Sequence, residues 1–157
     1  MIVIELPGEP RGKGRPRSRI ASSKGGGQQF VAVYTDAKTR AFEKALAWAG
    51  KAAMGARKPL LGPLAVAVEA VFGVPRSWSR RERDAALAGV RRPTGAPDCD
   101  NVFKTIDALQ GIVFANDSQI VEARITKRYG EEPMLRVEVR PAEPPLAVNP
   151  PAGGKGG

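Results

Sequence analysis

Two segments near the C-terminal end of the chain, residues 119–128 and 134–140, alternate between apolar and polar side chains. A period of two predicts β-strands, because successive side chains of a strand point to opposite faces. With one polar and one apolar face per strand, one face of the sheet is wet or charged and the other is covered by helices. Residues 130–133, Gly-Glu-Glu-Pro, predict a turn, so we expect the two strands to form an antiparallel hairpin.

Other patterns predict the remaining elements. We expect further strands at residues 2–6, 30–34 and 64–72. A helix is expected from a cap at Thr35 or Asp36 to about residue 54, with apolar side chains at helical spacing. Residues 79–89 form a short charged helix or a loop that carries the Arg80-Arg81 pair. Another helix is expected from Asn101 to Leu109, stopped by Gly111.

These elements predict an α+β fold, with a small mixed or antiparallel sheet and helices packed on one face. The length of 157 residues favours one domain. We place that domain at residues 1–140. Within it, residues 8–29 are rich in Gly, Pro, Ser, Arg and Lys and predict a long, mobile, basic loop. Residues 141–157 are rich in Pro, Ala and Gly and predict a disordered tail.

The charge of the chain is strongly positive and unevenly spread. There are 25 Lys and Arg against 16 Asp and Glu, a net charge of +9. Residues 1–59 hold 12 basic and 4 acidic side chains, whereas residues 98–140 hold 6 basic and 8 acidic ones. Such a balance indicates a polyanionic partner. The plainer alternative is a soluble basic protein whose Lys and Arg side chains are only solvated.

The chain has one cysteine, Cys99, and no histidine. This composition excludes disulfides within the chain, zinc sites of the Cys/His kind, and Ser-His-Asp or Cys-His catalysis. It fits a reducing cytoplasm. No apolar run approaches the roughly 20 residues of a membrane span, and the N-terminus lacks the pattern of a signal peptide. We therefore expect a cytoplasmic protein without a membrane partner.

Four carboxylates fall within a short span of this basic chain: Asp98, Asp100, Asp107 and Asp117. In an extended segment, Asp98 and Asp100 point to the same side, about 7 Å apart. Lys104 stands one helical turn above this pair. Oxygen ligands of this kind suit Mg²⁺, and a bound cation removes the repulsion between close carboxylates. The alternative is that Asp98 to Asn101 is ordinary helix-capping sequence and that Asn116-Asp117 is ordinary turn sequence.

The same residues resemble the RusA family of Holliday junction resolvases. The matching segments are Pro-Asp-Cys-Asp-Asn-Val-Phe-Lys at 97–104, Asp-Ala-Leu at 107–109, Gly-Ile-Val-Phe at 111–114, and Asn-Asp-Ser-Gln-Ile at 116–120. Upstream, the basic segment 10–17 (Pro-Arg-Gly-Lys-Gly-Arg-Pro-Arg) and the segment 75–79 (Pro-Arg-Ser-Trp-Ser) fit the family as well. The resemblance covers roughly residues 2–140.

The resemblance implies Asp98, Asp100 and Asp117 as catalytic acids and metal ligands, and Lys104 as an essential catalytic lysine. It also implies a homodimer with an α+β fold and Mg²⁺, or Mn²⁺ as a substitute. Two departures stand out: the segment between Lys104 and Asp107 is one residue short, and Asn116 replaces the first Asp of a usual Asp-Asp pair.

We therefore expect a Mg²⁺-dependent endonuclease, of bacterial or phage origin, that acts on four-way DNA junctions in recombination and repair. Two alternatives stay open: a non-catalytic basic DNA-binding module, and a nuclease for flaps or other branched DNA. Candidate contacts to the DNA backbone position the substrate without reading its sequence. They are Arg11, Lys13, Arg15, Arg17, Arg80 and Arg81.

Overall fold

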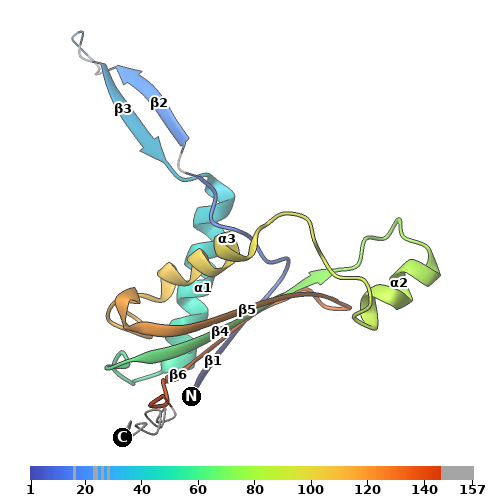
Figure 1. The fold of residues 1–157 in the computed structure, drawn as a ribbon. Coiled ribbons are helices and arrows are strands. Elements are labelled where there is room, and N and C mark those ends of the chain that lie inside the picture. The colour runs from blue at the N-terminus through green and yellow to red at the C-terminus, as the bar shows by residue number, and fades with distance from the viewer. Residues whose placement is uncertain (16, 23–24, 26, 28, 146–157) are drawn as a thin grey trace, which may run out of the picture.

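A computed structural model describes residues 1–15, 17–22, 25, 27 and 29–145 of the chain. Its elements are shown in Figure 1. In chain order they are β1 (Ile2–Pro7), β2 (Arg17–Ser22), β3 (Gln29–Tyr34), α1 (Ala37–Met54), β4 (Leu64–Gly73), α2 (Arg80–Leu87), α3 (Cys99–Phe103), the 3₁₀ helices η1 (Lys104–Leu109) and η2 (Asp117–Gln119), β5 (Ile120–Gly130) and β6 (Met134–Pro141).

The main sheet has four strands in the order β1-β6-β4-β5. β6 is antiparallel to β1 and to β4, while β4 and β5 run parallel. The predicted antiparallel hairpin of residues 119–128 and 134–140 is therefore wrong, because β4 lies between the two strands. β4 is mostly buried, whereas most of β5 is exposed or half-buried. The apolar strand β4 takes one of the two inner positions, and the local turn pattern at 130–133 carries no information about the order of the strands.

Helices cover one face of this sheet, as predicted. Side chains at paired positions of neighbouring strands share a face, and Ile4, Val137 and Val68 form such a row. This row lies in one core with apolar side chains from α1 and η1, such as Leu46 and Ile106. The opposite face carries charged side chains in ion pairs. They include Arg128 with Glu69 and Arg136 with Glu138.

The predicted cap of α1 is confirmed at Asp36. Its carboxylate accepts hydrogen bonds from the backbone N–H of Thr39 at 2.9 Å and from the Thr39 hydroxyl at 2.6 Å. The helix ends before Gly55, whose φ of 56° lies in the left-handed region that glycine adopts without strain.

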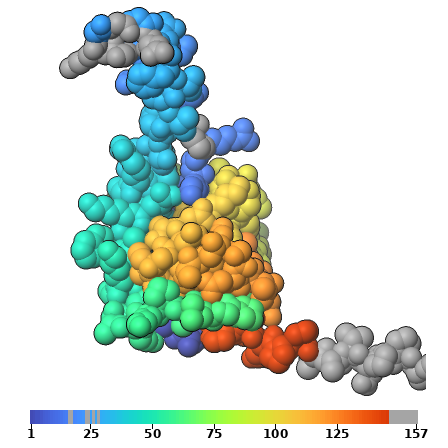
Figure 2. Space-filling model, turned by 90° about the vertical axis from the view of Figure 1, so that its left-hand side faces the viewer, coloured from blue at the N-terminus to red at the C-terminus, as the bar shows by residue number. Residues whose placement is uncertain are grey.

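Residues 8–29 are not simply a loop, as we had expected. Residues 17–22 form β2, which pairs with β3 in an antiparallel two-stranded sheet. We call this pair the ribbon (residues 17–22 and 29–34). It projects from the body of the protein beyond the N-terminal end of α1, as Figures 1 and 2 show. Residues 16, 23–24, 26 and 28 of the expected loop lie outside the described residues.

The expected helix from Asn101 to Leu109 is present but changes its type. It begins earlier, as the α-helix α3, and continues from Lys104 as the tighter 3₁₀ helix η1. Residues 79–89 contain the helix α2. Within the described part of the chain, no helix is both long enough and apolar enough to cross a membrane. Of the tail predicted to be disordered, residues 146–157 lie outside the described residues.

Candidate active site

The segment before the acidic pair is anchored to β5 by Lys127. The Lys127 Nζ donates hydrogen bonds to the backbone carbonyl oxygens of Gly95 at 2.7 Å and Pro97 at 2.9 Å. Three charge-assisted bonds are available to a lysine, and two of them are used here. This anchor places the start of α3 beside the C-terminal part of β5.

A second contact holds α3 from the N-terminal side of the chain. The backbone N–H of Lys13 donates to the carbonyl oxygen of Asn101 at 2.8 Å. Gly12 lies so close that a Cβ atom there would stand 2.7 Å from Pro97 Cβ and 3.1 Å from Asn101 Cβ. An open hollow of about 430 Å³ lies here, and Arg11 is part of its lining. A side chain at position 12 is thus incompatible with this approach.

Asp98 occupies the N-cap position of α3, but its side chain makes no capping hydrogen bond. The carboxylate is exposed, and none of the described hydrogen bonds involves it. The capping alternative therefore finds no support in the side chain of Asp98. What remains is an exposed carboxylate at a fixed position of the backbone.

Asp100 and Lys104 face each other one helical turn apart, as expected. The Lys104 Nζ donates to Asp100 Oδ2 at 3.1 Å, and both side chains are exposed. This hydrogen bond, together with the lysine's positive charge, lowers the pKa of Asp100 below its ordinary value. The pair therefore presents an ionised carboxylate next to an ammonium group, two residues from Asp98.

Asp117 lies at the other end of β5 from these residues. It begins η2 directly before β5, and from Ile120 to Lys127 the strand extends roughly 23 Å at about 3.3 Å per residue. Asn116, not Asp117, caps η2 by accepting from the Ser118 N–H at 2.9 Å. Among the residues that the structure describes, no three of His, Cys, Asp or Glu gather closely enough to hold a metal ion. The structure pairs Asp100 with Lys104, two residues after Asp98, but it does not bring Asp117 to them.

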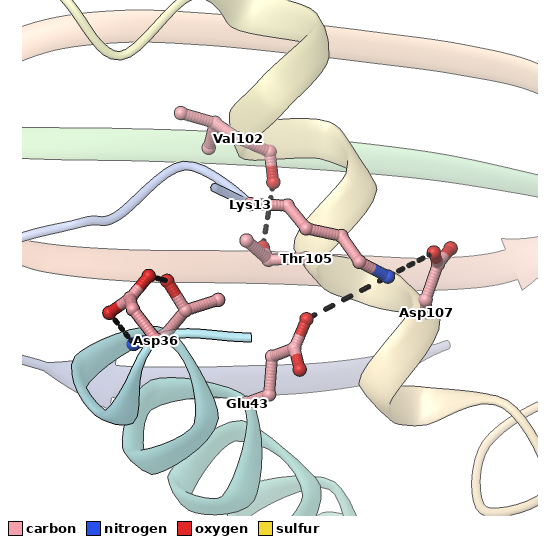
Figure 3. A network of polar contacts seen from close by, with 7 residues as sticks. Lys13, Asp36, Glu43, Val102, Thr105 and Asp107 are labelled. Carbon is pink, nitrogen blue, oxygen red and sulfur yellow. Dashed lines mark hydrogen bonds and ion pairs between the residues drawn. The ribbon is translucent and has the colours of Figure 1, made fainter. Parts of the chain in front are cut away.

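Lys13 and Asp107 form a separate polar network, drawn in Figure 3. The Lys13 Nζ donates to Asp107 Oδ2 at 2.9 Å and lies 3.7 Å from Oε1 of Glu43 on α1. The hydrogen bond to Asp107 is the main cause of a raised pKa for Lys13, and burial opposes it. Lys13 was expected to contact DNA. In the structure its charge is instead balanced by two carboxylates.

The other candidate DNA contacts lie in three places. Arg11 and Arg15 are exposed in the segment that leads to the ribbon, and Arg17 begins β2. Arg80 and Arg81 are exposed in the first turn of α2, which starts at a capping box formed by Ser79 and Glu82.

The segment around α2 is fixed to the same end of β5 that holds the start of α3. Trp78 packs edge-on against Tyr129, with ring centroids 5.2 Å apart, and the Arg91 guanidinium lies 3.6 Å from the centre of the Trp78 ring. Arg92 donates to the carbonyl oxygen of Lys127 at 3.2 Å. The segment that follows α2 and the segment that precedes the acidic pair are therefore both held by Lys127.

Several of these residues were not found by sequence reasoning. Lys127, Glu43 and Gly12 bring together segments far apart in the chain, and the local pattern around each is that of an ordinary strand, helix or loop. Only the proximity of the segments in the fold reveals their roles.

An α+β domain with basic segments on either side of an exposed acidic pair has the features of a protein that binds nucleic acid. The comparisons with known proteins agree. A family model described as "Endodeoxyribonuclease RusA" matches residues 7–140. The chain is also 32% identical over 145 residues to an uncharacterized protein, YqaN, of Bacillus subtilis (strain 168), covering 88% of this chain and 95% of that protein. The chain therefore belongs to the RusA endodeoxyribonuclease family.

Proposed function

We propose that this protein is a Mg²⁺-dependent endonuclease that resolves four-way DNA junctions by paired cuts, in the recombination and repair of bacterial or phage DNA in the cytoplasm. The observation that carries the proposal is the arrangement at α3. The Asp98 carboxylate makes no cap, and two residues on, Asp100 is held beside Lys104. In a member of the RusA endodeoxyribonuclease family, this arrangement is best explained as chemistry at a phosphodiester bond.

The acidic pair fits a magnesium ion by its donor chemistry. Mg²⁺ prefers oxygen ligands and is usually held by one or two carboxylates together with waters and substrate phosphate. Asp98 and Asp100 would supply such ligands, with Asp117 as the third; Mn²⁺ would substitute. A metal ion held there would supply an activated water and stabilisation of the leaving oxygen. Lys104 would hold a phosphate oxygen, since it stands next to Asp100 and is exposed to solvent.

A second copy of the chain would supply Asp117. Within one chain this residue lies at the far end of β5 from Asp98 and Asp100. In a two-fold symmetric dimer each copy can offer its acidic pair to one site and its Asp117 to the other. Two equivalent sites also suit a four-way junction, which needs two symmetric cuts to be resolved.

The basic residues would position the junction arms by contacts to phosphates. Arg80 and Arg81 lie on α2, and the segment after this helix is held by a hydrogen bond from Arg92 to Lys127, the residue that also anchors the segment before the acidic pair. They would therefore hold the DNA on the side of the scissile phosphate. Arg11, Arg15 and Arg17 would extend the contacts toward the ribbon. Lys13 would contribute less, because Asp107 and Glu43 already balance its charge.

Cleavage of a synthetic four-way junction tests the proposal directly. Wild-type protein should produce paired nicks in opposed strands with Mg²⁺ and none with EDTA. Binding without cleavage under both conditions would support the non-catalytic DNA-binding module instead. A panel of junction, flap and linear duplex substrates separates junction resolution from activity on other branched DNA.

A mixing experiment tests the shared site. Asp98→Asn and Asp117→Asn subunits, each inactive alone, should regain one intact site per mixed dimer and nick the junction in one strand. If each active site were complete within one chain, this mixture would stay inactive. A mixture of Asp98→Asn with Asp100→Asn is the control, because both changes fall in the same half-site and leave no intact site in any mixed dimer.

A further inference from the structure

The two faces of the β2–β3 ribbon differ in chemistry. Residues directly opposite each other in an antiparallel pair share a face, and side chains alternate along each strand. Arg19 lies opposite Ala32, and Ala21 opposite Phe30, so these side chains share one face with Tyr34. The other face carries no charged side chain. It is formed by Ser18, Ile20, Ser22, Gln29, Val31 and Val33.

The aromatic side chains of the first face are exposed to solvent. Phe30 is 55% exposed and Tyr34 46% exposed. Arg19, Ala32 and Tyr34 line a hollow of about 310 Å³, in which the half-buried Ala32 is flanked by two larger side chains. This face thus offers aromatic rings beside a guanidinium group, in a ribbon that stands away from the body of the protein (Figure 2).

The charge around the ribbon favours a polyanionic partner. Residues 11–34 contain six Lys or Arg and no Asp or Glu. Proteins that bind unpaired nucleic acid combine basic residues, which follow the backbone, with aromatic side chains on which bases stack. An isolated two-stranded ribbon is also only marginally stable in water. A DNA partner would add contacts that the ribbon alone lacks.

We infer that the face carrying Arg19, Phe30 and Tyr34 binds nucleobases that are unpaired or unstacked at the branch point of a DNA junction. The inference rests on the proposed function and adds to it the element that distinguishes branched from linear DNA. In the open form of a four-way junction, the base pairs at the branch point lack a stacked neighbour on one side, so exposing their bases to an aromatic side chain costs less than in a continuous duplex. Contacts to phosphates by other parts of the protein hold branched and linear DNA equally well, because they do not depend on the bases.

Binding measurements on ribbon variants test this inference. Phe30→Leu and Tyr34→Leu remove the rings and keep apolar side chains, while Val31→Thr and Val33→Thr make matched changes on the opposite face at 65% and 66% exposed positions. Affinity for a four-way junction and for a linear duplex would be measured with EDTA present, so that no cleavage occurs. Each aromatic change should weaken junction binding about tenfold and leave duplex binding nearly unchanged. The valine changes should leave both affinities nearly unchanged.

A second measurement uses the unaltered protein. With 2-aminopurine placed at the branch point, binding should change its fluorescence as the base leaves one stack for another, and Phe30→Leu should reduce that change. The inference is overturned if the aromatic variants bind the junction as well as wild type, if they lose junction and duplex affinity equally, or if the valine variants lose as much. Because these tests need no cleavage, they are independent of the nuclease proposal, which fails if wild-type protein with Mg²⁺ binds junctions but does not cut them.

Discussion

The Nζ atom of Lys13 lies 2.9 Å from Oδ2 of Asp107, although 94 residues separate the two along the chain. The contact ties the basic N-terminal segment to the 3₁₀ helix that follows the acidic pair. Glu43 of α1 completes the network at 3.7 Å, and its Oε1 atom is buried without a hydrogen-bond partner among the described residues. Lys13 thus joins three elements around the candidate active site.

Replacing Lys13 with Gln should therefore affect stability more than DNA binding. The lysine and Asp107 are both partly exposed, so we expect a loss of about 1 kcal/mol in the free energy of unfolding, at the upper end of surface ion pairs. The salt dependence of junction binding should keep its slope, whereas Arg80→Gln should flatten it by about 0.9 if that residue neutralises a phosphate. Urea unfolding and binding at several salt concentrations measure the two effects. A flattened slope for Lys13→Gln at unchanged stability would make Lys13 a phosphate contact.

Asp98→Asn and Asp100→Asn should each lower the cleavage rate at least about hundredfold, because each removes the charge of a proposed metal ligand and keeps its shape. Junction binding should survive in both. Asp84→Asn, an exposed acid on α2, is the control and should cut at the normal rate. Gel assays of cleavage and binding on one junction make the comparison, and near-normal cutting by either variant would remove that residue from the site.

Lys104→Ala should lower the cleavage rate by more than it weakens binding. One phosphate contact among many adds little affinity, but under the proposed mechanism the ammonium group beside Asp100 would stabilise charge that develops during the reaction. Single-turnover rates and dissociation constants give the ratio of the two effects. Equal losses in rate and affinity would reduce Lys104 to a simple DNA contact.

Gly12→Ala should disturb the candidate site because its new Cβ would lie 2.7 Å from Pro97 Cβ. Forced contacts of this kind typically cost about 1–3 kcal/mol. We expect a lower melting temperature and slower cleavage. Gly95→Ala is the matched control, since a Cβ there meets no atom within 4 Å. If the two variants behaved alike, the close approach of residue 12 to α3 would have no role.

Asp36→Ala should lower the melting temperature by removing the cap of α1, and the effect should depend on pH. The hydrogen bonds from Thr39 lower the pKa of Asp36 below its ordinary value of 3.8. A lowered pKa in the folded state means that the stabilisation is fully present above the ordinary value and is lost as the pH falls through the lowered one. The difference in melting temperature between wild type and variant should thus be constant near neutral pH and shrink in acid. A difference that did not change with pH would show that the charge of Asp36 contributes nothing.

The sequence allowed prediction of those elements whose signal is local. The Asp36 cap and the helical spacing behind it located α1 closely, and the apolar period of residues 64–72 located β4. The alternation in 119–128 and 134–140 identified two strands but not their neighbours, because strand order depends on which strand is most buried. Likewise, no local signal linked residues 17–22 to their partners in β3, since Arg and Ser there are as common in loops as in exposed ribbons.

The candidate site likewise contains contacts that local sequence predicted and contacts that only the fold reveals. The helical spacing predicted that Lys104 would face Asp100, and the structure confirms this pair. The extended segment expected for Asp98 and Asp100 is wrong, because α3 already begins at Cys99. Lys127 and Gly12 act on that segment from other parts of the fold, and only the packed chain shows their contacts. Asp117 lies far from the acidic pair because β5 separates them. The spacing of residues in a motif does not contain this distance.

The position of β6 between β1 and β4 has a consequence for the folding of the protein. Among the described strands β1 comes first and β6 last, yet β1 joins the rest of the sheet only through β6. The sheet is therefore closed by pairings between the two ends of the domain, and they bury Leu135, Val137 and Val139. Contacts between residues this far apart in the chain form late and slow folding, because a long loop must close before they form. The core beneath α1 and α3 thus depends on the slowest class of contact in the domain.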